Sequence, residues 1–331
     1  MKKIINDPNA VVEEMIKGMV AAHGDQLKQV PNSTVLARKE SPLQGKVGLV
    51  SGGGSGHEPS HAGFVGKGML DAAVCGSVFT SPTPDQVLEG IKAVDGGSGV
   101  LLIIKNYTGD VMNFEMAAEL AEMEGLMVEK VVVNDDVAVE DSTYTTGRRG
   151  IAGTVFVHKI AGAKAETGAS LTEVKAAAEK TIASVRSMGM ALTPCTIPAA
   201  GKPGFEIGEN EMEVGMGIHG EPGIARSEIQ TADEIASALV EKILADGIHM
   251  PGDEVAVMIN GLGSTPLMEL YILNAKVSEL LKERGLTIYK TFVGEFMTAI
   301  DMAGCSVSLL KLDDELKSLL DSPSEALGFR I

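Results

Sequence analysis

Short runs of apolar residues alternate with amphipathic segments along the first half of the chain. Strands are predicted for four predominantly apolar runs, at 46–50, 72–75, 100–104 and 127–133. Helices are predicted where apolar residues recur at helical spacing, at 11–20, 84–94 and 112–124. Strands and helices that alternate in this way are typical of crossover units, so we expect a mostly parallel sheet with helices on both faces.

The second half of the chain repeats this alternation less regularly. Helices are predicted at 150–165 and 171–188, and a segment rich in proline and glycine follows at 194–208. Beyond it, the pattern predicts strands at 213–218, 254–259, 287–293 and 306–310, and helices at 232–245, 266–283 and 313–320. We therefore expect an α/β protein with two α/β domains, residues 1–189 and 190–331, the first built on a mostly parallel sheet flanked by helices.

The net charge and the spacing of the cysteines argue against several classes of function. The chain has 28 Lys and Arg against 45 Asp and Glu, and this net charge of −17 argues against a nucleic-acid or anionic-membrane partner. Cys75, Cys195 and Cys305 lack CxxC spacing, so neither a disulfide framework nor a zinc site is expected. The N-terminal segment is too polar for a signal peptide, and no apolar stretch is long enough to span a membrane. We expect a soluble, cytoplasmic protein.

The densest cluster among the 39 glycines is Gly-Gly-Gly-Ser-Gly-His at 52–57. A glycine run after a strand lets backbone N–H groups approach a ligand, and the terminus of a following helix would favour an anion. No Gly-Lys-Ser/Thr closes the run, and His57 stands where a dinucleotide fingerprint or a nucleophile elbow needs its last glycine. The segment is therefore either an unusual ligand cradle that ends in His57 or a flexible turn with a surface histidine. Its position between a strand and a helix favours the cradle.

Two further segments carry polar residues where a ligand could bind. The strand at 100–104 leads into Lys105, which could attract an oxygen-rich ligand, and Asp110, a candidate general base. Asp110 could instead cap the helix that follows. His219 lies in a glycine-rich segment at 215–223, and a neutral imidazole nitrogen can add to the carbonyl carbon of a ketone or aldehyde. The alternative is that His219 only completes a tight turn.

Five motifs follow one another along nearly the whole chain. They are Gly-Gly-Gly-Ser-Gly-His-Glu-Pro at 52–59, Phe-Thr-Ser-Pro-Thr-Pro at 79–84, Lys-Asn-Tyr-Thr-Gly-Asp at 105–110, Gly-Arg-Arg-Gly at 147–150 and Gly-Ile-His-Gly-Glu-Pro-Gly at 217–223. Together they resemble the dihydroxyacetone kinase family, and specifically its substrate-binding K subunit or domain. The combination is far more specific than any single motif.

This resemblance implies roles for individual residues. It implies that His219, in the C-terminal domain, binds dihydroxyacetone covalently as a hemiaminal at the substrate carbonyl. His57 and Asp110 match the catalytic positions of the family, whose members are homodimers of two-domain protomers. The other matches are substrate-binding positions: Gly54, Ser55, Gly56, Ser81 and Lys105.

The phosphoryl donor is expected on another chain. The sequence shows no nucleotide-binding motif and no carboxylate cluster for Mg²⁺; we interpret Asp135-Asp136 as a solvated acidic loop. The resemblance therefore implies the subunit type of kinase, in which ADP and Mg²⁺ lie on a separate L subunit. That nucleotide is rephosphorylated from phosphoenolpyruvate through a phosphotransferase-system M subunit. Neither a cofactor nor a metal is expected in this chain, which has no room for the further nucleotide-binding domain of the single-chain kinases.

Some alternatives stay open on the sequence alone. Arg148 and Arg149 either face the partner subunit or its phosphate, or they pair with local acidic residues. The chain as a whole could be a non-catalytic sensor that binds dihydroxyacetone through His219 in order to regulate another protein. The presence of both Asp110 and His57 favours the enzyme, because a sensor needs the covalent histidine but no base.

Overall fold

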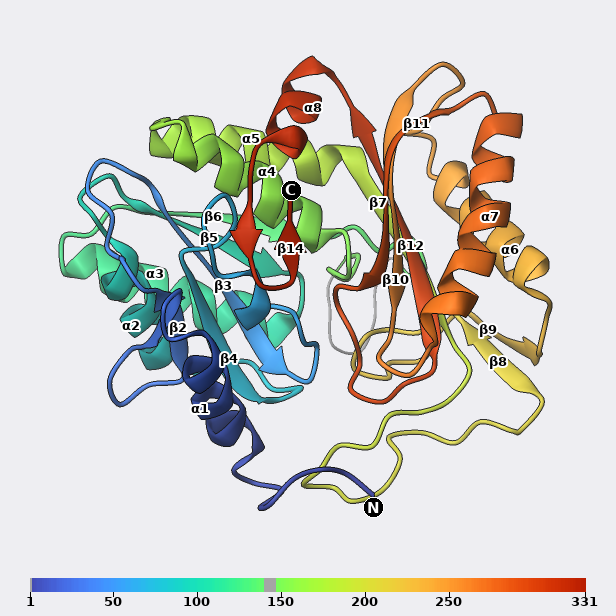
Figure 1. The fold of residues 1–331 in the computed structure, drawn as a ribbon, viewed down its shortest axis with the longest axis horizontal. Helices are drawn as coiled ribbons and strands as arrows, with labels where there is room; N and C mark the ends of the chain where they lie inside the picture. Colours follow the sequence, from blue (N-terminus) through green and yellow to red (C-terminus); the bar gives the residue numbers. More distant parts are fainter. Residues whose placement is uncertain (1, 140–146) are drawn as a thin grey trace.

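Two six-stranded sheets lie side by side in the protein, with helices between them and on their outer faces (Figure 1). The computed structural model describes residues 2–139 and 147–331. The predicted α/β class is confirmed, and the alternation of strands and helices in the first half follows the predicted order.

The first sheet has the strand order β1-β2-β4-β3-β5-β6 and is parallel through its last four strands. These parallel strands are β3 (Gly48–Ser55), β4 (Ala72–Val78), β5 (Val100–Lys105) and β6 (Val128–Val133). Helices α2 (Pro84–Val94) and α3 (Thr108–Met123) cover one face of the sheet and share a core with it. Preceding these, α1 (Val11–His23) leads into two short antiparallel strands that were not predicted, β1 (Leu27–Gln29) and β2 (Val35–Arg38).

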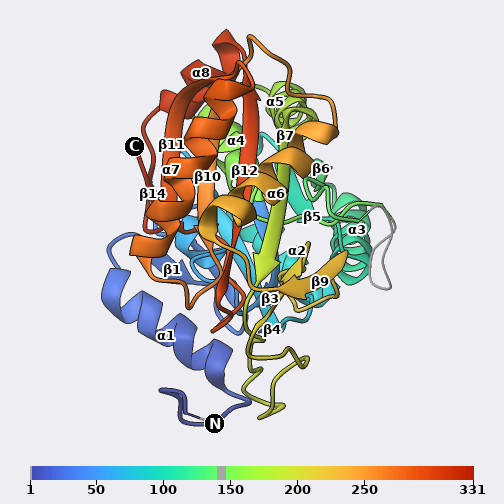
Figure 2. The same cartoon turned by 90° about the vertical axis from the view of Figure 1, so that its right-hand side faces the viewer.

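The second sheet is mixed, with the order β11-β10-β12-β7-β8-β9. Its strands are β7 (Val185–Ala191), β8 (Glu211–Val214), β9 (Ala225–Glu228), β10 (Glu254–Gly261), β11 (Thr287–Glu295) and β12 (Gly304–Leu312). Helices α6 (Ala232–Ala245) and α7 (Leu267–Glu283) cover its outer face (Figure 2). The chain ends with α8 (Asp314–Asp321) and the hairpin β13 (Glu325–Ala326) and β14 (Phe329–Arg330).

Helices α4 (Thr154–Glu166) and α5 (Leu171–Ser184) lie between the two sheets. One hydrophobic core contains residues of both sheets, such as Leu101 and Met258, together with Phe156 of α4. Nearly every residue of α4 is buried, because protein surrounds the helix on all sides. This shared core holds the loops at the ends of the two sheets in a fixed relation to each other.

Two predicted elements were wrong in part. The predicted helix at 171–188 ends at Ser184, and the chain continues directly into β7, whose pairing with β12 outweighs the helical pattern. Residue 190 thus lies inside a strand of the second sheet. The predicted strand at 213–218 ends at Val214, because Gly215 adopts a positive φ of 79° and turns the chain.

In the described part of the chain, the helices and the placement of potential metal ligands bear on membrane and metal binding. None of its helices is long and apolar enough to cross a bilayer. Within the same residues, no group of three or more histidine, cysteine or acidic side chains is placed to hold a metal ion. The three cysteines are free and buried.

Candidate active site

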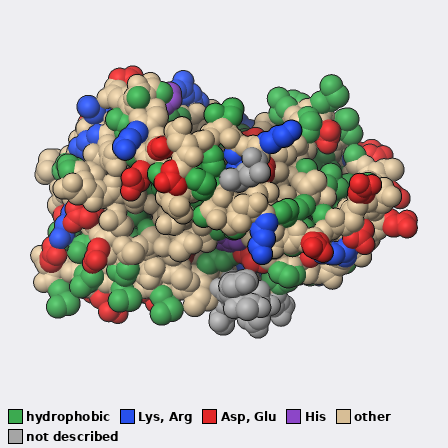
Figure 3. All heavy atoms as spheres, turned by 90° about the horizontal axis from the view of Figure 1, so that it is seen from below, with side chains coloured by type: hydrophobic (Ala, Val, Ile, Leu, Met, Phe, Trp, Pro, Cys, Tyr) green, Lys and Arg blue, Asp and Glu red, His purple; other side chains and the backbone are tan. Residues whose placement is uncertain are grey.

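A cavity of about 790 Å³ lies where loops from both sheets meet. Figure 3, which looks at the molecule from below, shows a histidine side chain between the two halves. The first sheet contributes residues that follow β4 and begin α3, and the second contributes the turn after β8 and the loop that precedes it. The lining residues include Gly54, Phe79, Ser81, Tyr107, Asp110, Phe205, His219 and Glu221.

The glycine run belongs to strand β3 and not to a loop, which corrects the prediction. The backbone of a neighbouring segment lies so close to the glycines that no side chain would fit there. A Cβ at Gly54 would lie 2.6 Å from the Cα of Phe79. A Cβ at Gly53, which has a φ of 148°, would lie 3.0 Å from the Lys105 Nζ. The helix expected after the run was also wrong, since only a 3-10 turn, Ala62–Phe64, follows. A helix terminus therefore plays no part in this segment.

His57 follows the strand and is completely buried. Its Nδ1 lies 2.7 Å from the carbonyl oxygen of Thr298, and its ring stacks on Phe79 with centroids 5.1 Å apart. A carbonyl can only accept, so Nδ1 carries the proton and Nε2 is the acceptor nitrogen. Burial, with Lys105 and His219 nearby, lowers the pKa of His57 well below 6.5. The ring is therefore a neutral acceptor at neutral pH, and Nε2 has no hydrogen-bond partner among the described residues.

Lys105 and Asp110 form a buried pair beside the glycine strand. Lys105 is the last residue of β5, Asp110 lies in the first turn of α3, and the Lys105 Nζ is 3.9 Å from the Asp110 Oδ2. Burial lowers the pKa of Lys105, against the attraction of Asp110 and Glu221. The capping alternative was wrong: α3 begins at Thr108, with Tyr107 at the N-cap position and no side-chain cap hydrogen bond.

His219 is oriented by a carboxylate two residues further along the chain. The His219 Nδ1 lies 2.8 Å from the Glu221 Oε1, and the backbone N–H of His219 donates to the Glu221 Oε2 at 2.9 Å. Burial raises the pKa of Glu221, but His219 and Arg149 outweigh this effect and bring it to about 2. Since an ionised carboxylate only accepts, the His219 Nδ1 carries a proton, and Nε2 is the nitrogen that holds the lone pair whenever the ring is neutral.

Three aromatic rings surround His219. The rings of Tyr107, His57 and Phe79 contact it edge-on, with centroids 4.6, 4.8 and 5.2 Å away. These contacts fix the plane of the imidazole from several sides. The tight turn is also present, because Gly220 has a φ of 80°. His219 therefore lies in a tight turn and also lines the cavity, so the turn does not exclude a role in the site.

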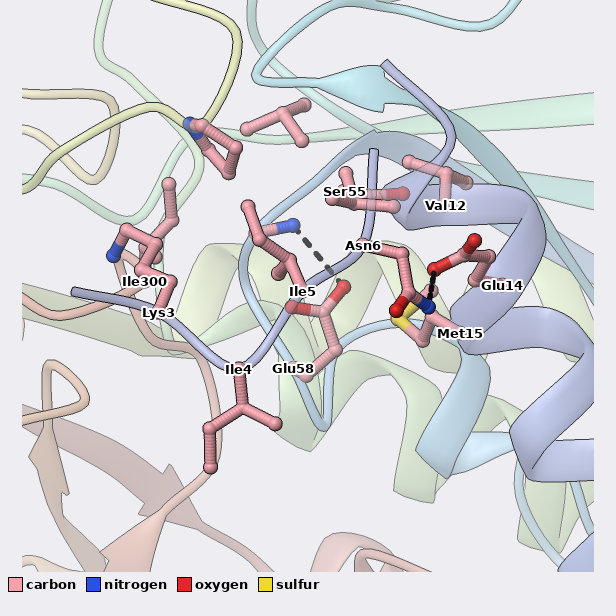
Figure 4. A pocket seen from close by; sticks show the side chains of 14 residues that line it. Lys3, Ile4, Ile5, Asn6, Val12, Glu14, Met15, Ser55, Glu58 and Ile300 are labelled. Carbon is pink, nitrogen blue, oxygen red and sulfur yellow. Dashed lines mark hydrogen bonds between the residues drawn. The ribbon is translucent and has the colours of Figure 1, made fainter. Parts of the chain in front are cut away.

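The structure brings most of the predicted site residues together but separates two of them. Gly54, Ser81, Asp110 and His219 line the cavity, His57 contacts the His219 ring, and Lys105 contacts Asp110. Ser55 and Gly56 instead line a second cavity of about 610 Å³ on the other side of the strand (Figure 4). The Ser55 hydroxyl donates to the carbonyl of Gly76 at 2.7 Å. Neither Ser55 nor Gly56 lines the cavity that contains His219.

Sequence reasoning missed the acidic and basic groups beneath the site. The solvated acidic loop predicted at Asp135-Asp136 was wrong, because both residues are buried. Asp136 forms an ion pair with Arg149 at 2.7 Å, and Asp135 accepts hydrogen bonds from two backbone N–H groups. Arg148 pairs with Asp246. Both arginines therefore pair with acidic residues of this chain. This was one of the two alternatives that the sequence left open for Arg148 and Arg149.

The fold and the site together define an α/β protein whose cavity is lined by an oriented histidine and by the aspartate of a buried lysine–aspartate pair. A family model described as the Dak1 domain matches residues 17–328. The chain belongs to this family, and the resemblance to the dihydroxyacetone kinase family is confirmed.

Three known proteins illustrate the relationship. The chain is 60% identical over 315 residues to the dihydroxyacetone-binding subunit DhaK of PTS-dependent dihydroxyacetone kinase 1 from Listeria innocua, covering 95% of each chain. The crystal structure of the dihydroxyacetone kinase of C. freundii is 37% identical, with a TM-score of 0.91, over 99% of this chain and 60% of that one. A dihydroxyacetone kinase operon co-activator, DhaQ, is also 37% identical, with a TM-score of 0.89, over 95% and 97% of the two chains.

Proposed function

We propose that this chain is the dihydroxyacetone-binding catalytic subunit of a phosphoenolpyruvate-dependent dihydroxyacetone kinase. The observation that carries the proposal is the hydrogen bond of 2.8 Å between the His219 Nδ1 and Glu221, which leaves Nε2 as a nucleophile. The high identity to a subunit named for dihydroxyacetone binding supports the choice of substrate.

The first step is reversible addition of His219 to the substrate ketone. The Nε2 lone pair forms a bond to the carbonyl carbon, and the π electrons of the C=O bond move to the oxygen. That oxygen takes up a proton and becomes the hemiaminal hydroxyl, while the imidazole releases its Nδ1 proton. Glu221 stabilises the positive charge on the ring during this exchange, because its carboxylate already contacts Nδ1.

The second step is phosphorylation of a terminal hydroxyl of the bound substrate. Asp110 accepts the hydroxyl proton as the oxygen attacks the γ-phosphorus of the nucleotide, and ADP is the leaving group. His57 assists as a neutral acceptor through Nε2, which has no partner among the described residues. Positioning is the main requirement of phosphoryl transfer, and a covalent anchor on His219 supplies it.

The covalent bond also accounts for selectivity. Glycerol offers the same hydroxyl groups as dihydroxyacetone, and noncovalent contacts often separate such similar small molecules by only about 10–200-fold. A site that requires a carbonyl excludes polyols from the hemiaminal altogether.

The partners follow from the same proposal. The nucleotide and Mg²⁺ are held by a separate L subunit, which a phosphotransferase-system M subunit rephosphorylates from phosphoenolpyruvate. Two copies of this chain form a homodimer, and neither nucleic acid nor a membrane takes part. The acidic net charge of −17 supports this last point.

A dihydroxyacetone sensor is the second candidate function. The similarity to an operon co-activator over 95% of this chain favours it. The buried Lys105–Asp110 pair and His57 support the enzyme, because a sensor needs no base. Mixing the chain with an ADP-loaded L subunit, a phosphorylated M subunit and dihydroxyacetone distinguishes the two. We expect dihydroxyacetone phosphate to accumulate, whereas binding without product would support the sensor and contradict the proposal.

A further inference from the structure

A buried arginine lies beneath the carboxylate that orients His219. Arg149 has no solvent exposure, and its Nε and Nη2 lie 2.7 Å from the Asp136 Oδ2. The same Nη2 donates to the carbonyl oxygen of Gly215 at 2.6 Å. Nη1 is the remaining nitrogen of the guanidinium, and it has no hydrogen-bond partner among the described residues. One edge of the guanidinium is thus fixed, and the other edge carries the unpartnered nitrogen.

The unpartnered nitrogen and Glu221 converge on Gly217. A Cβ at Gly217 would lie 2.1 Å from the Glu221 Oε2 and 2.7 Å from the Arg149 Nη1. Both atoms are therefore within 2.7 Å of one point, which only a glycine leaves free. The same Oε2 accepts the backbone N–H of His219, so the cation lies beside the carboxylate that contacts His219 twice.

We propose that Arg149 is a positioning residue for His219, which acts through Glu221. Held by Asp136 and the Gly215 carbonyl, its guanidinium keeps the buried Glu221 carboxylate ionised and in place. Glu221 then binds the Nδ1 proton of His219, and Nε2 is left unprotonated toward the cavity. This inference rests on the proposed covalent role of His219.

The electrostatic surroundings agree with this role. Glu221 is only 5% exposed, so its charge needs a nearby cation to offset the loss of hydration. Arg149 acts in this direction, since it lowers the pKa of Glu221. The other groups near this carboxylate are Lys105, Tyr107 and His219. Arg149 is the only permanently charged cation of the set.

A merely structural role is the alternative, because the same arginine ties the loop at Asp136 to the turn at Gly215. Two variants separate the roles. Asp136→Asn removes the ion pair but keeps the cation beside Glu221. The double variant Arg149→Met with Asp136→Asn removes the ion pair and the cation together, and it leaves no unpaired buried charge at Asp136. Arg149→Lys restores a cation without the planar fork.

The experiment reads the His219 tautomer and the adduct in parallel. Protein labelled with ¹⁵N-histidine is examined by NMR without ligand, and titration with dihydroxyacetone followed by native mass spectrometry gives the adduct affinity. We expect wild type, Asp136→Asn and Arg149→Lys to show a protonated Nδ1 and an unprotonated Nε2 at His219. In the double variant we expect mixed tautomers and about tenfold weaker adduct formation, the lower end of the loss seen when the partner of a metal-binding histidine is removed.

Each other outcome has a defined meaning. If the double variant shows the wild-type tautomer spectrum and adduct affinity, the proposal is overturned. It is also overturned if Asp136→Asn alone loses as much adduct affinity as the double variant. If the double variant does not fold, the same readouts are taken on Glu221→Gln, which removes the charge that Arg149 holds; unchanged tautomers there overturn the proposal. Absence of an adduct in the wild type contradicts the proposed function instead, while the tautomer spectra still test Arg149.

Discussion

The imidazole rings of His57 and His219 lie edge to face with centroids 4.8 Å apart, although they come from opposite halves of the chain. His57 follows the glycine strand of the first sheet, and His219 follows a strand of the second. The contact exists because the two sheets share one hydrophobic core around α4, which brings their loops to the same place. A single small substrate can therefore meet a nucleophile from one sheet and a base from the other.

Replacing His219 with alanine should abolish the covalent adduct. The side chain is 17% exposed and lies at the cavity, outside the hydrophobic cores of the two sheets, so the variant should keep its fold. Native mass spectrometry with dihydroxyacetone should lose the mass increment of the bound substrate. The matched control is His23→Ala at the end of α1, which should keep it. An adduct that survives in His219→Ala would exclude this residue as the nucleophile.

Replacing Asp110 with asparagine should separate binding from turnover. Asp110 takes no part in the proposed addition of His219 to the carbonyl, so the adduct should persist, whereas loss of the base should lower kcat by about 10²–10⁴-fold. A coupled assay with the phosphorylated partner subunits measures the rate. Asp85→Asn is the control, because Asp85 also lies in the first turn of a helix but is exposed. A near-normal rate in Asp110→Asn would remove this residue from the base role.

A methyl group at Gly54 should destabilise the protein and weaken substrate binding. It would lie 2.5 Å from the Thr80 nitrogen and 2.6 Å from the Phe79 Cα, so backbone must move. We expect Gly54→Ala to lower the free energy of unfolding by about 1–3 kcal/mol in urea titrations. Gly18→Ala in α1 meets nothing within 4 Å and should instead raise it by about 0.5–1 kcal/mol. Equal effects at the two positions would contradict the close packing around Gly54.

The sequence predicted the first half of the fold well because its strands are buried on both faces. A fully apolar run such as residues 100–104, with helices on either side, leaves few other interpretations. Strand β7 was missed for the opposite reason. No glycine or proline marks the junction of Ser184 and Val185, so the helical pattern of the sequence continues past it. The helix ends there only because the following strand pairs with β12. Long-range strand pairing of this kind leaves no local trace.

The sequence predicted the histidines of the site but not its buried charged residues, because the burial of those residues depends on contacts made only in the fold. Histidines among glycines stand out in a sequence, so His57 and His219 could be found without the structure. Charged residues are usually solvated, and only the fold buries Asp136 against Arg149 and brings Arg149 and Glu221 close to Gly217. One local signal in the sequence pointed to a contact between Glu221 and His219. Glu221 follows His219 by two residues, and the glycine-rich turn offers no bulky side chain to keep the two apart.

Buried histidines should make the protein less stable in acid. Burial lowers the pKa of His158 from 6.5 to about 3 and that of His249 to about 4. The unfolded chain takes up these protons near pH 6.5 and the folded chain does not, so this stability is complete above pH 6.5 and is lost as the pH falls. Asp136 acts in the opposite direction, since burial raises its pKa from 3.8 to about 6 and folding gains stability as the pH falls between these values.

The free energy of unfolding should therefore fall between pH 7.5 and pH 5, because the two histidines His158 and His249 together outweigh the opposite effect of Asp136 in this range. In His249→Gln it should fall by about 2 kcal/mol less than in wild type, from one proton over this range. Urea titrations at the two pH values measure both differences. A variant that loses as much stability as wild type would contradict the assignment to His249.

The central claim is that His219 forms a covalent bond to the substrate carbonyl carbon. The most direct measurement is ¹³C NMR of dihydroxyacetone labelled at its carbonyl carbon, bound to protein labelled with ¹⁵N-histidine. The claim predicts a tetrahedral carbon signal with a one-bond coupling to a histidine ring nitrogen, which disappears in His219→Ala. A bound substrate that keeps its ketone signal, with no coupling to nitrogen, would contradict it.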